Sequence, residues 1–281
     1  MNAPHFAQFV LVLCISLANI SLEAASLPGV FFPEVYTTDA FDRNNTFGWR
    51  FTLSSDIDVT ALGYFDETSL PSGTGAGLAQ SHQLGIFRAP DQALLASNTI
   101  PAGASAPLMG NFRYVDLNSP VRLTAGTIYV MAGSALSASP DNAAAVTNWT
   151  MAPGVTFANS PIPDPNSTKI GTSMYIVSVH GNPSPVLTYP ALLMTGNLPI
   201  FAANFVFTFP APQLFDLHVS ADSVLVSVTN LVLGVTNTVE KSQDLITWQP
   251  EQTFVASSTA TNLQLGPAPD TRAFYRVKII Y

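Results

Sequence analysis

The chain has 281 residues, enough for one or two domains at a prior of roughly 150 residues each. Its 22 prolines outnumber its 10 lysines and arginines, and only 10% of the residues are charged, which favours short strands joined by turns over long helices. A net charge of −8, with the basic residues scattered along the chain, argues against a nucleic-acid partner and against binding to anionic lipid.

The N-terminus carries an apolar run, Phe9–Ala18, that is too short to span a bilayer. Small residues follow it, with Ala24 and Ser26 at the two positions that signal peptidases favour. We predict that residues 1–26 are a signal peptide cleaved near Ala24 to Ser26, and that the mature protein is secreted or otherwise extracytoplasmic. The alternative is a buried N-terminal strand, because no Lys or Arg precedes the run.

The single cysteine, Cys14, lies inside this leader. We therefore predict a mature protein without disulfides or thiol chemistry. No later apolar run is long enough to cross a membrane, so we expect no membrane span in the mature chain.

Strand-like runs bounded by turn residues recur after the leader, as expected of an antiparallel β-sandwich or jelly roll. The sequence predicts one such domain over residues 27–210, with strands at Trp49–Leu53, Val59–Phe65, Gln83–Phe87, Asn111–Leu117, Thr127–Met131, Ser173–Val177 and Phe201–Phe209.

Alternation along two of these strands predicts which side chains face the core. Phe112, Tyr114 and Leu117 are set against Arg113 and Asp116, so the apolar side chains are expected inside and the charged ones outside. Phe205, Phe207 and Phe209 form a second alternating set.

Pro210-Ala-Pro212 ends this block, because prolines cannot donate to a β-ladder. We predict a small β-sandwich module over residues 211–281, with strands at Val224–Val228, Thr236–Ser242, Thr261–Leu265 and Ala273–Tyr281. A module this small without disulfides is only marginally stable alone, so we expect it to pack on the larger domain.

Two family resemblances rest on specific strings. Gly48–Phe51, Val59–Glu67, Gly77–Phe87, Phe112–Val115 and Leu123–Val130 resemble a family of secreted bacterial β-sandwich domains of unknown function, often found in exosortase-sorted surface proteins; the match ends near Phe209. Val239–Trp248 with Phe274–Val277 looks like a fibronectin-type-III-like terminal module common in exported proteins of the Verrucomicrobia and their relatives. The resemblance implies an Ig-like or fibronectin-III-like C-terminal fold and no catalytic residues. The sorted proteins' terminal Pro-Glu-Pro motif is not present, which argues against anchoring by that route.

No local motif for catalysis is present: there is no Gly-x-Ser-x-Gly, no His-Glu-x-x-His, no phosphate-binding glycine loop and no EF-hand loop. The three histidines beyond the leader, His82, His180 and His218, fit no known metal spacing. We predict that the protein is not an enzyme. Paired carboxylates for glycoside hydrolysis stay open, because such pairs meet only in the fold.

The loop from Asp66 to His82 is the best candidate region for ligand binding. Asp66 and Glu67 end a predicted strand and precede a run of Gly, Ser and Thr, so their carboxylates are candidate calcium ligands and the His82 imidazole is a candidate ligand contact. Alternatively, Asp66 accepts hydrogen bonds from loop amides and His82 is a satisfied strand-edge residue, and this is the interpretation that we favour.

A second oxygen-rich loop runs from Asp39 to Asn45, and its Asp39, Asp42, Asn44 and Asn45 make it a comparable calcium candidate. We predict no organic cofactor, and a structural calcium ion is the one cofactor that this chemistry leaves open.

Trp49 and Trp149 are candidates for a sugar-stacking platform, with burial in the core as the alternative for a Trp that begins a strand. Three functional classes remain. The first is a non-catalytic extracellular or cell-surface protein that binds a polysaccharide or another surface protein, which we favour. The others are a carbohydrate-active enzyme with loop carboxylates and a passive structural component of an envelope or biofilm.

Overall fold

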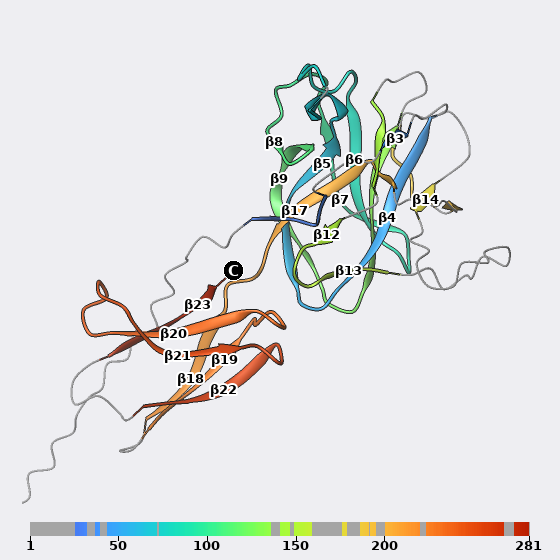
Figure 1. The fold of residues 1–281 in the computed structure, drawn as a ribbon. Helices are drawn as coiled ribbons and strands as arrows, with labels where there is room; N and C mark the ends of the chain where they lie inside the picture. The colour runs from blue at the N-terminus through green and yellow to red at the C-terminus, as the bar shows by residue number, and fades with distance from the viewer. Residues whose placement is uncertain are drawn as a thin grey trace, which may run out of the picture. The chain divides into compact units, whose positions relative to one another are not determined.

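The computed structural model describes residues 26–32, 37–39, 44–71, 73–135, 141–146, 149–158, 176–178, 186–190, 192–194, 200–219, 223–266 and 273–280. Every ladder between the described strands is antiparallel, and the only helical element among these residues is one 3-10 turn, η1 (Glu67–Ser69). The predicted all-β, sandwich-like fold is therefore confirmed. The chain divides into two compact units, one formed by Ala24–Pro210 and one that contains Ala211–Tyr281 (Figure 1).

The larger unit is built on two sheets. The first has the strand order β1 (Leu27–Pro28), β17 (Ala203–Thr208), β5 (Ile57–Phe65), β9 (Phe112–Leu123) and β8 (Leu108–Met109). The second has the order β15 (Leu192–Met194), β14 (Ile176–Ser178), β4 (Asn45–Leu53), β10 (Ile128–Ala135), β6 (His82–Arg88) and β7 (Ala93–Ile100), and β13 (Val155–Phe157) also pairs with β4.

Two short ladders complete this unit. One joins β16 (Ile200–Phe201), β11 (Ala143–Ala145) and β3 (Thr37–Asp39), and the other joins β12 (Thr150–Met151) to β2 (Val30–Phe31).

Aromatic side chains fill the space between the two sheets. Phe205 of β17 stacks on Trp49 and Phe51 of β4, with ring centroids 5.7 and 4.8 Å apart. The Trp49 indole is fully buried, and its Nε1 donates to the carbonyl of Ala203 at 2.7 Å. These contacts join strands of different sheets, so Trp49 belongs to the sandwich core rather than to a surface platform.

The start of β9 departs from the predicted alternation. Phe112 and Tyr114 are buried as expected, but Arg113 between them is also buried, at 6% exposure. The expectation that Arg113 faces solvent is therefore wrong. Its guanidinium is retained inside by an ion pair with Asp66, whose geometry is described below.

The second unit consists of two three-stranded sheets with the orders β18 (Gln213–Val219), β19 (Val224–Thr229), β22 (Ala260–Leu265) and β21 (Gln249–Val255), β20 (Thr236–Ser242), β23 (Phe274–Ile280) (Figure 1). Val226, Val239, Leu263 and Tyr275 belong to one buried cluster that draws on both sheets, so the unit has its own core. Two of its strands, β18 and β21, were not predicted, because the first is interrupted at Asp216 (φ 53°) and the second contains Pro250.

Candidate functional site: the loop from Asp66 to His82

The loop begins with a helix cap at Asp66. The Asp66 Oδ1 accepts hydrogen bonds from the Thr68 amide at 2.9 Å and from the Thr68 hydroxyl at 2.6 Å, and the Ser69 hydroxyl donates to the Asp66 carbonyl at 2.6 Å. Asp is favoured at this position because its side chain satisfies amides at the start of a helix that lack intrahelical partners. Asp66 therefore fixes the one turn of η1 that follows β5.

Thr68 holds the glycine-rich part of the loop against η1. Its hydroxyl accepts from the Gly77 amide at 2.9 Å, and its carbonyl accepts from the Gly75 amide at 2.8 Å. Gly77 has φ +84°, and a Cβ there would lie 2.2 Å from the backbone of Gly103. The loop thus packs backbone against backbone at a point that only glycine fits.

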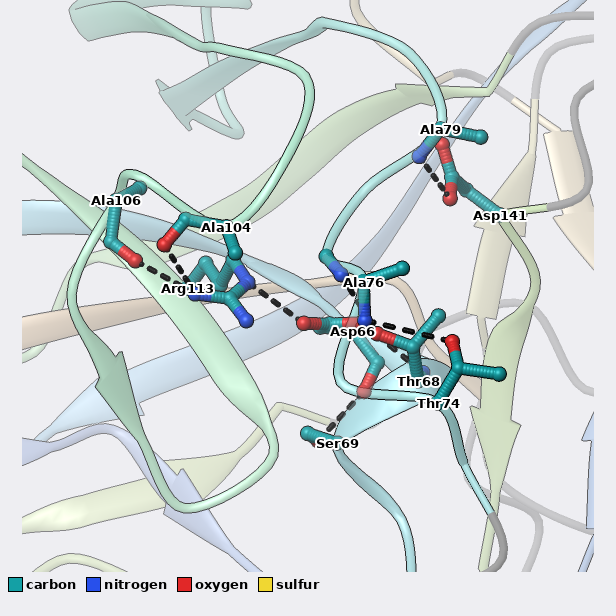
Figure 2. A network of polar contacts seen from close by, with 11 residues as sticks. Asp66, Thr68, Ser69, Thr74, Ala76, Ala79, Ala104, Ala106, Arg113 and Asp141 are labelled. Atoms are coloured by element: carbon teal, nitrogen blue, oxygen red, sulfur yellow. Dashed lines mark hydrogen bonds and ion pairs between the residues drawn. The ribbon is translucent and has the colours of Figure 1, made fainter.

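Arg113 closes the cluster from β9 (Figure 2). Its Nε donates to Asp66 Oδ2 at 2.6 Å, and its Nη1 donates to the carbonyls of Ala104 and Ala106, each at 2.9 Å. The Asp66 side chain is fully buried, and both of its oxygens are occupied. This geometry matches the hydrogen-bonding interpretation of Asp66 and offers no support for calcium at its carboxylate.

His82, at the other end of the loop, is the centre of a second buried polar cluster. Its Nδ1 lies 2.7 Å from the carbonyl oxygen of Ser134, and its Nε2 lies 3.0 Å from Asp141 Oδ2. Both partner atoms are hydrogen-bond acceptors, and the roles of the two ring nitrogens depend on the tautomer. The imidazole also stacks on the Tyr64 ring at 3.8 Å between centroids.

Asp141 binds the loop backbone as well as His82. Its Oδ1 accepts from the Ala79 amide at 2.7 Å, and its Oδ2 accepts from the Gln80 amide at 2.9 Å (Figure 2 shows the Ala79 contact). Burial by itself raises the pKa of Asp141, but the hydrogen bonds from His82 and the two amides outweigh it, so the pKa lies below its ordinary value. Burial of the Tyr64 hydroxyl, together with the nearby Asp141 charge, raises the pKa of that hydroxyl.

The remaining calcium candidates are placed as follows. Glu67 Oε2 accepts from the side-chain amide of Asn142 at 2.7 Å, which links η1 to the segment that carries Asp141. Asp39 is described only as a backbone position in β3, and Asp42 lies outside the described residues. Within the described part of the chain, no three His, Cys, Asp or Glu side chains gather as potential metal ligands.

The two histidines that the structure describes belong to different units. His82 is buried in the larger unit, and His218 lies exposed on β18, 3.1 Å from Asp216. His180 lies outside the described residues.

Trp149 is an aromatic residue among the predicted ligand residues, and its side chain is partly exposed. It is half-buried just before β12, and its ring meets Phe157 of β13 edge-on at 6.1 Å and 80°. Phe157 in turn packs edge-on against the core residue Trp49 at 5.6 Å. An aromatic series therefore leads from the core to a supported indole at the surface.

Arg113 and Asp141 were not predicted as members of these clusters. Arg113 lies 47 positions from Asp66, and Asp141 lies 59 positions from His82. The local signal at Asp66, a carboxylate followed by Thr68 and Ser69, predicts its cap but not its distant partner.

No family model matches the chain, and no curated protein matches it. Among the residues that the structure describes, no helix has the length and apolar character needed to cross a membrane.

Proposed function

We propose that this chain is a secreted, non-catalytic protein that binds a polysaccharide or another component outside the cell. The chemical support concerns Asp66 and His82, the acidic and basic residues that the sequence singles out. Both are buried, and their polar atoms bond to partners inside the protein, so they stabilise the fold rather than face a substrate.

Trp149 is the observation that carries the binding proposal. Sugar recognition uses aromatic rings that are fixed from one side and open on the other. The edge-on contact with Phe157 supplies the support, and the half-buried indole supplies the open side. We propose Trp149 as the stacking residue of a glycan site.

Secretion is proposed from the apolar leader over residues 1–26. Its support is that Leu27 and Pro28 already pair with Phe207 and Val206 of β17. Cleavage near Ala24 to Ser26 would therefore leave all of β1 in the mature protein. The two family resemblances support the same export.

Affinity electrophoresis of the secreted protein in gels that contain a panel of soluble polysaccharides tests this proposal. We expect one polysaccharide class to retard the protein and Trp149→Ala to abolish the retardation. Phe31→Ala is the matched control, because Phe31 is also an exposed aromatic residue, on the strand that pairs with β12. New reducing ends in the same mixtures would instead indicate a carbohydrate-active enzyme, and no retardation by any polysaccharide would contradict the glycan site.

A further inference from the structure

Strand β23 forms an edge of the β21-β20-β23 sheet in the second unit (Figure 1). All seven of its residues pair with β20 in an unbroken register, from Phe274 opposite Ser242 to Ile280 opposite Thr236. None of the described strands pairs with its other edge. In an antiparallel ladder, alternate residues direct their backbone N–H and C=O away from the partner, so this edge offers a row of backbone groups for another strand.

Two of the other three edges in this unit carry features that block strand addition. β18 has a register shift after Phe215, where Asp216 adopts φ 53°. β21 contains Pro250, which has no N–H to donate, and its register shifts opposite Val239 and Glu240. Bulges and prolines are common ways in which proteins protect sheet edges.

The fourth edge, β22, is regular but less suited to strand addition. Its exposed positions are Ala260, Asn262 and Gln264, and the first two of these side chains have low β-propensity. It provides an internal control, because it is an open edge of the same unit with a different surface.

The side chains of β23 leave apolar surface for an added strand to cover. Val277 lies opposite the core residue Val239 and packs on the core while staying only partly buried. Ile279 is also partly buried, and Ile280 on the outer face is 47% exposed. A neighbouring strand would shield side chains on both faces of the sheet.

The charged side chains of β23 indicate which residue type an added strand should carry opposite them. Arg276 donates to Glu240 at 2.6 Å, so its charge is already matched. Lys278 is exposed opposite Thr238 and makes no ion pair within the described residues. An incoming strand therefore gains from an acidic residue opposite Lys278.

A second copy of β23 does not fit this edge. Two β23 strands could pair antiparallel so that the cores of both copies of the second unit lie on the same side of the joined sheet. The registers that pair most of β23 with itself then place Arg276 opposite Arg276, Arg276 opposite Lys278, or Lys278 opposite Lys278. Like charges directly opposite each other destabilise strand pairing.

We propose that β23 accepts an extended segment of another protein as an added antiparallel strand, with an acidic residue opposite Lys278 and aliphatic residues opposite Val277 and Ile279. The main chain supplies the affinity and the alternate side chains supply the selectivity. This surface lies on the second unit and extends the proposed function, since it does not involve the glycan candidate Trp149.

The test uses the full secreted chain and two synthetic peptides that alternate threonine and valine, one with a central glutamate and one with a central lysine. Amide hydrogen exchange is followed by NMR. We expect the glutamate peptide to slow exchange of the outward amides of β23 and to leave β22 unchanged. The lysine peptide should bind about fivefold more weakly, because one favourable cross-strand pair is lost.

Lys278→Glu is the matched variant, since an exposed side chain changes without a cost to the core. It should reverse the preference between the two peptides, and Trp149→Ala should leave the peptide effect intact even if glycan binding is lost. The proposal is overturned by unchanged exchange in β23 with both peptides, by slowing along β22 instead, or by a Lys278→Glu variant that still prefers the glutamate peptide.

Discussion

At the scale of single residues, the Asp66–Arg113 ion pair is the interaction whose loss should cost the most. Both partners are buried, so Arg113→Met leaves an uncompensated carboxylate in the interior and should lower the free energy of unfolding by about 3–5 kcal/mol. Arg122→Met is the control, because Arg122 pairs with Asp58 at the surface and should cost less than about 1 kcal/mol. Equal losses for the two variants in urea denaturation would contradict a structural role for Asp66.

Asp141 gives the stability of the larger unit a dependence on acid. Its pKa is lowered in the folded state, so its contribution is present above the unfolded value of about 3.9 and is lost as the pH falls through the folded value. Asp141→Asn should therefore be less stable than the wild type at neutral pH, and the difference should shrink below about pH 4. A difference that stays constant from pH 7 to pH 3 in urea denaturation would contradict this role.

The sequence singles out Asp66 and His82 but not their partners Arg113 and Asp141. Asp66 and His82 stand out because a loop rich in glycine lies between them, and the alternative in which Asp66 accepts hydrogen bonds from loop amides is met by the Thr68 amide. Asp66 and His82 are buried beside Arg113 and Asp141, which are distant in the sequence and are brought close only by the fold. An alternating pattern places Arg113 outside, because periodicity does not register an ion pair formed across the fold.

At the scale of elements, the loop between β5 and β6 depends on backbone contact at Gly77. Gly77→Ala combines a positive φ with a Cβ 2.2 Å from the Gly103 backbone, whereas Gly75→Ala has a positive φ and open space around it. We expect Gly75→Ala to cost about 1 kcal/mol of unfolding free energy and Gly77→Ala about 1–3 kcal/mol more. Equal costs in thermal unfolding would show that the loop does not pack against Gly103.

The strands that the sequence predicts well are those with buried, β-branched or aromatic residues and few interruptions. β4 and β5 extend the predicted runs by a few residues, and β10 begins one residue later than predicted. β7 was not predicted. In this strand the large apolar residue Leu94 is exposed and the small residue Ala96 is buried, so the positions of large apolar residues do not mark the buried face.

At the scale of the whole molecule, composition predicts the all-β class because few charges and many prolines suit short strands and turns. Composition does not predict function. The residues most suggestive of chemistry, Asp66 and His82, prove to be internal, and Trp149 is partly buried and contacts Phe157 of β13. Binding in a β-sandwich depends on such contacts between loops and strands, which no local motif records.

Thermal unfolding of residues 27–281, measured with a panel of soluble polysaccharides in the presence and absence of millimolar calcium, tests the proposed binding role most directly. A ligand that binds only the folded protein should add about 2.7 kcal/mol at a hundred times its dissociation constant. We expect one polysaccharide class to raise the melting temperature of the wild type and not of Trp149→Ala. A cooperative transition that no polysaccharide shifts, with or without calcium, would contradict a glycan-binding function.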